Sequence, residues 1–166
     1  MACKRGVLVG GLAVACMLVA TPVVLGQATD PWIGTWKLNL AKSTYSPGPP
    51  PKSNTLKIEV VAGGLQKHTF DGLNAQGQPT HSERLAKFDS TDVPVQAVQP
   101  PSQAVATNAF RRLDARSFEV VGKSDGKVAG TNRIVISPDG KTMTVTVVGT
   151  DAQGQKVNST IVYDRQ

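Results

Sequence analysis

The sequence has very little of the side-chain chemistry on which most enzymes and metalloproteins depend. Its 166 residues include only two cysteines and two histidines. Both cysteines, Cys3 and Cys16, precede residue 29, so the rest of the chain has neither a disulfide nor a thiol nucleophile. No glycine-rich loop leads from a strand into a helix, as nucleotide-binding fingerprints require. We therefore expect no catalytic residue, no enzymatic activity and no cofactor.

Aromatic residues are also scarce, at 5% of the chain. Binding of single-stranded nucleic acid needs exposed aromatic rings beside a basic stripe. Here the basic residues are interspersed with acidic ones, and the few aromatic residues fit core positions better. We therefore expect no nucleic-acid partner. The formal net charge of +6 is interpreted as a solubility feature, and affinity for acidic cell-surface polymers is the alternative.

Residues 1–28 have the pattern of an export signal. Lys4 and Arg5 precede an uncharged stretch over 7–25, and small residues at Gly26 and Ala28 occupy the positions that a signal peptidase reads. Cleavage after Ala28 removes both cysteines and lowers the formal net charge to +4. The sequence therefore predicts a periplasmic or secreted bacterial protein with one domain over 29–166 and no membrane span left after cleavage.

Two alternatives to a cleaved signal remain open. The uncharged stretch of 19 residues approaches the length that spans a bilayer, which would make it an uncleaved anchor. The segment ending in Cys16 also loosely matches a lipid-attachment motif, but the apolar run continues past it. Pro22 and the small residues at the end favour cleavage.

From residue 30 onwards the pattern is that of short strands separated by turns. Trp36, Leu38 and Leu40 alternate with polar residues, and no amphipathic helix is evident. We expect about nine strands, over 36–40, 56–60, 65–71, 80–88, 105–114, 117–122, 127–137, 141–149 and 156–163. This predicts an all-β fold, a single antiparallel meander barrel of about 8–9 strands.

A short repeat supports this hairpin pattern. The segment 72–78 (GLNAQGQ) recurs 77 residues later as 149–155 (GTDAQGQ). Each copy is predicted to be a hairpin loop with Gly77 or Gly154 in the left-handed conformation. For the second hairpin this predicts three pairs: Val147 with Ser159, Val145 with Ile161, and Met143 with Tyr163. Two related half-barrels are one interpretation of the repeat.

Two proline-containing segments, 42–54 and 89–103, do not fit strands and are predicted to be loops. Long loops in small β-domains often form lids or binding edges. A passive crossover is the alternative.

The segment Trp32-Ile33-Gly34-Thr35-Trp36 resembles the first strand of lipocalin-like, or calycin, β-barrels. The resemblance implies that Trp36 plugs the closed end of the barrel and that Arg165, near the last strand, packs on it. The chain is also similar to uncharacterised small secreted bacterial proteins with a Gly-Thr-Trp first strand, which implies no activity. It departs from lipocalins in having no helix after the barrel.

The candidate ligand-binding residues are those expected to face the barrel interior. By analogy with Val145, His68 points inward and pairs with Arg84, while His81 faces outward, so no metal site is expected. Arg111 and Arg112 are neighbours on a strand and must face opposite ways. Arg111 is the candidate anchor for an anionic head group, and pairing of both arginines with Asp114 or Glu119 is the alternative. The predicted pocket comprises His68, Phe70, Arg111, Val145, Ile161 and Tyr163.

The sequence thus predicts an exported barrel that binds a small apolar or amphiphilic molecule. The alternative is a structural or interaction protein of the cell envelope, with a side-chain-filled barrel that acts through a strand edge or the proline-containing loops. An internal cavity of several hundred Å³ would favour ligand binding.

Overall fold

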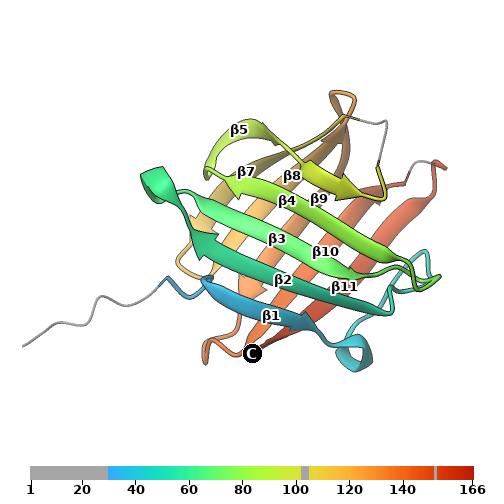
Figure 1. Cartoon of the computed structure of the whole chain (residues 1–166), viewed down its shortest axis with the longest axis horizontal. Coiled ribbons are helices and arrows are strands. Elements are labelled where there is room, and N and C mark those ends of the chain that lie inside the picture. Colours follow the sequence, from blue (N-terminus) through green and yellow to red (C-terminus); the bar gives the residue numbers. More distant parts are fainter. Residues whose placement is uncertain (1–29, 102–104, 152) are drawn as a thin grey trace, which may run out of the picture.

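The computed structural model describes residues 30–101, 105–151 and 153–166 (Figure 1). The predicted export signal over 1–28, with Cys3 and Cys16, lies outside these residues. Within the described ranges, no helix is long and apolar enough to cross a membrane.

The described chain is built from strands and two single-turn 3-10 helices, which confirms the all-β prediction. The helices are η1 (Leu40–Lys42) and η2 (Ala62–Gly64). The strands are β1 (Gly34–Leu38), β2 (Ser53–Val60), β3 (Gln66–Leu73), β4 (Pro79–Ala86), β5 (Asp89–Pro94), β6 (Gln96–Gln99), β7 (Ala106–Asp114), β8 (Ser117–Ser124), β9 (Lys127–Ile136), β10 (Thr142–Thr150) and β11 (Lys156–Arg165).

All these strands form one antiparallel sheet that curls into a nearly closed barrel. The order is β5-β7-β8-β9-β10-β11-β1-β2-β3-β4-β6. Figure 1 shows β1 to β4 crossing in front of β7 to β11. The two ends of the sheet, β5 and β6, are separated in the chain by Val95 alone. One continuous segment therefore pairs with β7 through its first part and with β4 through its second part, which bridges the gap in the wall.

The number of strands differs from the predicted 8–9 because of this segment. Each of the nine predicted segments forms a strand, and the two additional strands, β5 and β6, lie in 89–103, which was predicted to be a loop. Pro94, Pro100 and Pro101 lower the strand propensity there. The pairings are irregular, with register shifts in both ladders. Their partners, β7 and β4, supply hydrogen bonds that the local sequence does not indicate.

The repeated hairpins have the predicted register. Val147 pairs with Ser159, Val145 with Ile161, and Met143 with Tyr163. In both loops the glycine is left-handed, with φ of 87° at Gly77 and 80° at Gly154. In the first loop, the side-chain oxygen of Asn74 accepts a hydrogen bond from the backbone N–H of Gln78 at 2.9 Å. In the second loop, the side-chain oxygen of Asp151 accepts the equivalent bond from Gln155 at 2.8 Å. The two copies of the motif therefore form the same turn.

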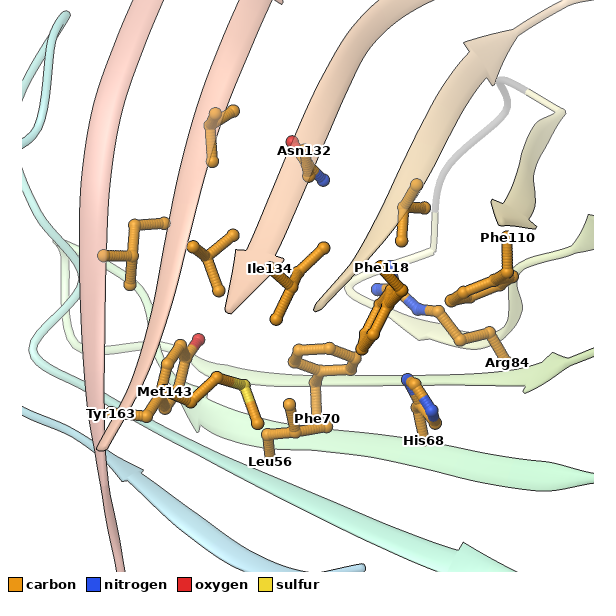
Figure 2. A pocket seen from close by; sticks show the side chains of 14 residues that line it. Leu56, His68, Phe70, Arg84, Phe110, Phe118, Asn132, Ile134, Met143 and Tyr163 are labelled. Carbon is orange, nitrogen blue, oxygen red and sulfur yellow. The ribbon is translucent and has the colours of Figure 1, made fainter. Parts of the chain in front are cut away.

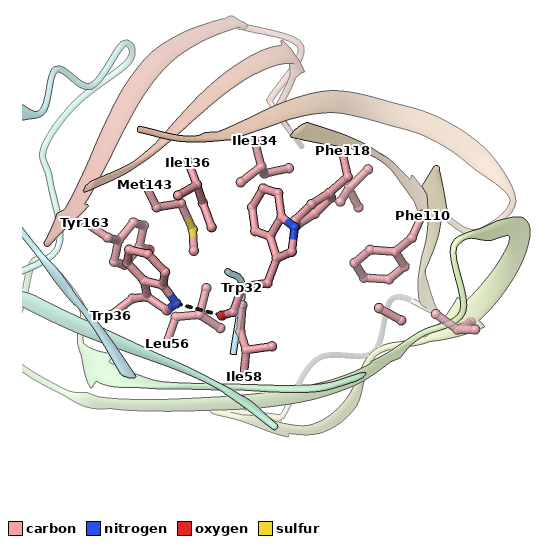
Figure 3. Close-up of a cluster of buried hydrophobic side chains, with 13 residues drawn as sticks. Trp32, Trp36, Leu56, Ile58, Phe110, Phe118, Ile134, Ile136, Met143 and Tyr163 are labelled. Carbon is pink, nitrogen blue, oxygen red and sulfur yellow. Dashed lines mark hydrogen bonds between the residues drawn. The ribbon is translucent and has the colours of Figure 1, made fainter. Parts of the chain in front are cut away.

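The closed end of the barrel is filled by two fully buried tryptophans (Figure 3). Trp36 donates a hydrogen bond from Nε1 to the Trp32 carbonyl at 3.0 Å. The Trp32 ring packs edge-on against Phe118, with 4.4 Å between ring centroids. The rings fill this end of the core, where Trp32 Nε1 is buried without a hydrogen-bond partner in the described chain.

Arg165 covers the outer face of this plug, as the calycin resemblance implies. Its guanidinium carbon lies 4.3 Å from the centre of the Trp36 ring. The same group donates hydrogen bonds to the carbonyls of Gly140 and Ile33, both at 2.8 Å, and to that of Pro31. Gly34 has φ of +139°, and a Cβ there would lie 2.8 Å from Arg165 Nη1. The backbone conformation at this position therefore favours glycine, and a Cβ would also displace the tip of the Arg165 side chain.

Replacing Trp36 with alanine is expected to lower the free energy of unfolding by about 3–5 kcal/mol, because it removes a fully buried ring and leaves a cavity beneath Arg165. Urea unfolding followed by circular dichroism measures this. The control is Val128→Ala, at a residue that is 65% exposed, which should change stability by less than about 0.5 kcal/mol. Equal effects of the two substitutions would contradict the role of Trp36 as a plug.

Candidate functional site

A cavity of about 150 Å³ lies inside the barrel, beyond the tryptophan plug (Figure 2). Eight strands contribute to its wall, which places it in the interior. It is smaller than the several hundred Å³ set out as the expectation for a ligand site, and close to an engineered cavity of about 150 Å³ that admits benzene. Its lining residues are Leu56, His68, Phe70, Arg84, Phe110, Phe118, Val120, Asn132, Ile134, Met143, Val145, Val147, Ile161 and Tyr163.

Strand alternation brings five of the predicted site residues together in this cavity. On β10, Met143, Val145 and Val147 face inward while the threonines between them face outward. The ladder places Ile161 and Tyr163 of β11 beside Val145 and Met143. His68 and Phe70 reach the cavity from β3, two residues apart on the same face. Their position inside the barrel follows the predicted register, and their binding role stays a prediction.

The expected interior position of Arg111 is corrected by the structure. Its side chain is 59% exposed on the outer face, where Nη2 lies 2.9 Å from Glu119 Oε1. The neighbouring Arg112 turns inward because it lies two residues after the buried Phe110 and therefore on the same face of β7. Arg112 lies at the closed end, where it pairs with Asp30 at 3.2 Å and stacks on Phe88 at 4.5 Å. Neither arginine lines the cavity.

The cation in the cavity is Arg84, on β4, which the sequence analysis did not select. Its guanidinium carbon lies 4.3 Å from the centre of the Phe70 ring. Nη2 donates one long hydrogen bond to Ser82 Oγ at 3.4 Å, and Nε is shielded from water with no partner in the described chain. Burial lowers the pKa of Arg84 to about 10, so the side chain stays charged at neutral pH. The predicted strand register already paired Arg84 with the inward-facing His68, and this pairing could have indicated that Arg84 also faces the interior.

His68 is held as a neutral ring in the wall of the cavity. It is 2% exposed and packs edge-on against Phe110. Its Nε2 donates to Gln66 Oε1 at 3.3 Å, and Gln66 Nε2 in turn donates to Asp30 Oδ2 at 2.9 Å. Burial, followed by the charge of Arg84, lowers the pKa of His68 to about 3. This ring therefore takes no proton at neutral pH.

The other polar features do not form a metal or nucleophile site. His81 lies on the outer face as predicted, with Nδ1 2.6 Å from Asp71 Oδ1. Within the described ranges, no group of three or more His, Cys, Asp or Glu side chains is placed to hold a metal. The segment 122–126 has the Gly-x-Ser-x-Gly spacing of a nucleophile elbow, but it comprises the end of strand β8 and the two-residue turn that leads into strand β9. An elbow requires a strand-to-helix turn.

A wider groove of about 740 Å³ adjoins the cavity at Arg84, which lines both. One wall consists of Pro94, Val95, Val98 and Pro101, from the segment predicted to be a lid or binding edge. The opposite wall comes from the adjoining ends of β7, β8 and β9, including Gly122 and Ala129. The groove therefore connects the position of Arg84 with the outside.

These features define a class of protein: an all-strand, nearly closed antiparallel barrel with an interior cavity, compatible with a lipocalin-like fold. No protein-family model matches the chain, and no curated protein sequence matches it. The assignment to this class of barrel therefore rests on the arrangement of the strands alone.

The pKa of His68 predicts a specific dependence of stability on pH. Unfolded histidine has a pKa of about 6.5, so between this value and about 3 the unfolded state binds more protons than the native state. The free energy of unfolding should therefore fall as the pH drops below 6.5, approaching about 1.4 kcal/mol per pH unit. Urea unfolding between pH 5.0 and 6.5 measures the slope. This range lies above the pH at which the exposed aspartates lose their stabilising interactions.

His68→Phe should remove this slope while keeping an apolar ring between Phe110 and Phe118. His81→Gln, which removes the histidine of the outer face, is the control and should retain a slope of the same sign. An unchanged slope in His68→Phe would show that His68 is not the group responsible.

Proposed function

We propose that the protein is an exported, calycin-type β-barrel that binds a small, mostly apolar molecule in its interior. The observation that carries this proposal is the cavity, whose wall has only four polar side chains, His68, Arg84, Asn132 and Tyr163, among fourteen. Apolar walls with a few polar groups are typical of small-molecule sites. Each Å² of apolar surface that a ligand buries there contributes roughly 25 cal/mol.

The energetics of the cavity favour an occupant. Sealed apolar cavities destabilise proteins by about 24 cal/mol per Å³, which sets an upper limit of roughly 4 kcal/mol on what filling a space of 150 Å³ recovers. Larger side chains at Val120, Val145 or Val147 would fill it. A ligand that contacts these walls recovers part of the lost packing.

We infer binding rather than catalysis from the protonation states in the cavity. Three titratable groups, His68, Arg84 and Tyr163, have shifted pKa values. Burial raises the pKa of the Tyr163 hydroxyl, which donates to Asn54 Oδ1 at 3.0 Å. Around neutral pH, His68 and Tyr163 therefore stay neutral and Arg84 stays charged. A general acid or base works best with a pKa near the operating pH.

The cavity proposal predicts that Val145→Phe abolishes binding of a small neutral probe, because the larger ring occupies the space. Hexan-1-ol, whose chain is of about the size of the cavity, is a suitable probe, and ligand-observed NMR measures its binding. The control is Val148→Phe on the same strand, at a residue that is 56% exposed. It should bind hexan-1-ol as the unchanged protein does.

Absence of binding to the unchanged protein would favour the alternative of a filled barrel that acts through its surface. Equal binding by the two variants would place the probe outside the cavity.

We also propose that residues 1–28 direct export and are removed. Support comes from the charge pattern of this segment and from the position of Asp30. Its carboxylate accepts hydrogen bonds from Gln66 and Arg112, at 2.9 and 3.2 Å. Cleavage after Ala28 therefore leaves the anchoring contacts of Asp30 intact.

The mature protein, recovered from the periplasm or medium of its host, is expected to begin at Thr29 and to contain no thiol. Intact-mass measurement and labelling with a thiol reagent test this. A mass that includes Cys16 with an attached lipid would instead establish the lipid-anchored form, and a full-length mass in the membrane fraction would establish an uncleaved anchor.

A further inference from the structure

Building on the proposed ligand-binding function, we propose that the ligand is a small amphiphilic monocarboxylate, with its carboxylate on Arg84 and its apolar part in the cavity. The groove beyond Arg84 is the route by which it enters.

Arg84 has no counter-charge among the described residues. Three arginines of the described chain pack on aromatic rings, and two of them have clear partners: Arg112 pairs with Asp30, and Arg165 donates to three backbone carbonyls. Arg84 has only the long hydrogen bond to Ser82. No carboxylate of the described residues forms an ion pair with it, since the neighbouring Glu83 lies on the outer face, 2.7 Å from Lys67 Nζ. A cation that is partly removed from water and has no counter-charge is costly, and an anionic ligand relieves that cost.

The guanidinium of Arg84 lies where the cavity meets the groove. Figure 2 shows the Arg84 side chain extending from β4 toward the interior, among the Phe70, Phe110 and Phe118 rings. Arg84 is part of the wall of both the cavity and the groove. A head group bound there has an apolar space on one side and the route to solvent on the other. This arrangement matches a molecule with one charged end and one apolar end.

The shape and the single charge of Arg84 favour a carboxylate over other anions. A guanidinium presents its N–H donors in a planar fork that fits a carboxylate. Arg84 is the single cationic residue in the described wall of the cavity, so one negative charge balances it. A phosphate dianion would remain half-neutralised in an apolar environment. The Phe70 ring beneath the guanidinium limits its orientation, and the Ser82 hydroxyl is an additional donor beside it.

The experiment compares four ligands with the same six-carbon chain: hexanoate, hexan-1-ol, hexylamine and hexyl phosphate. Titration calorimetry with ligand-observed NMR gives the dissociation constants at pH 7. We expect hexanoate to bind at least tenfold more tightly than hexan-1-ol, because a hydrogen bond to a charged group exceeds a neutral one. Hexylamine should bind more weakly than hexan-1-ol, and hexyl phosphate more weakly than hexanoate.

Arg84→Met keeps the apolar stem and removes the charge. It should weaken hexanoate binding at least tenfold and leave hexan-1-ol binding within about threefold, which also verifies that the cavity is intact. Arg84→Lys, which keeps the charge but not the fork, should be intermediate. Arg111→Met, at the exposed arginine on the outer face, is the matched control and should leave both affinities unchanged.

The outcomes separate this proposal from the proposed function. Equal affinities of the unchanged protein for hexanoate and hexan-1-ol would overturn the carboxylate assignment and leave a neutral-ligand barrel. Tighter binding of hexyl phosphate would replace the carboxylate with a phosphate. Failure of all four ligands would overturn both proposals. If Arg84→Met does not fold, the order of affinities in the unchanged protein still decides.

Discussion

The contact between Arg165 and Trp36 is the constraint on which the rest of the barrel depends. It joins β11, the last strand, to β1, the first, and so closes the wall where strands from opposite ends of the described chain must meet. The guanidinium satisfies backbone carbonyls of the segment that precedes β1 while it covers the indole ring. This explains why glycine is favoured at Gly34, two residues before Trp36, since a side chain there would displace the tip of Arg165.

With the closed end filled in this way, stability and binding are separated along the barrel axis. The tryptophans, Phe118 and the neighbouring aliphatic side chains form a packed layer. Beyond this layer, residues of smaller volume such as Val120 and Val145 leave space. The same alternation of inward and outward side chains builds both regions, so the cavity arises from the size of the side chains and not from a change of fold.

Three arginines packed on aromatic rings illustrate how similar contacts serve different ends. Arg165 and Arg112 each stack on an aromatic ring and have hydrogen-bond or charge partners within the protein. Arg84 also stacks on an aromatic ring, yet it has no charge partner in the described chain and only one long hydrogen bond, to Ser82, and it lies beside the cavity. Because burial of an uncompensated cation opposes folding, its persistence next to an apolar space is the strongest chemical signal in the molecule.

Much of the architecture is determined by the sequence itself. Period-two alternation, turn residues such as Gly77 and Gly154, and the repeated hairpin motif act over a few residues, so they are visible without coordinates. They were sufficient for the nine main strands, for the register that pairs Val145 with Ile161, and for the inward direction of His68. The packing of Arg165 on Trp36 came from resemblance, because no local pattern indicates it.

The remaining features were decided by the tertiary structure. β5 and β6 are strands because β7 and β4 offer them hydrogen bonds, which outweighs the prolines of that segment. Alternation along β7 places Arg111 and Arg112 on opposite faces. Which of the two points inward depends on Phe110 being buried, because Arg112 lies two residues after it on the same face. The choice of Arg84 as the cavity cation and the volume of the cavity depend on how side chains from eight strands meet. Such contacts join residues far apart in the chain, and no pattern within a single segment encodes them.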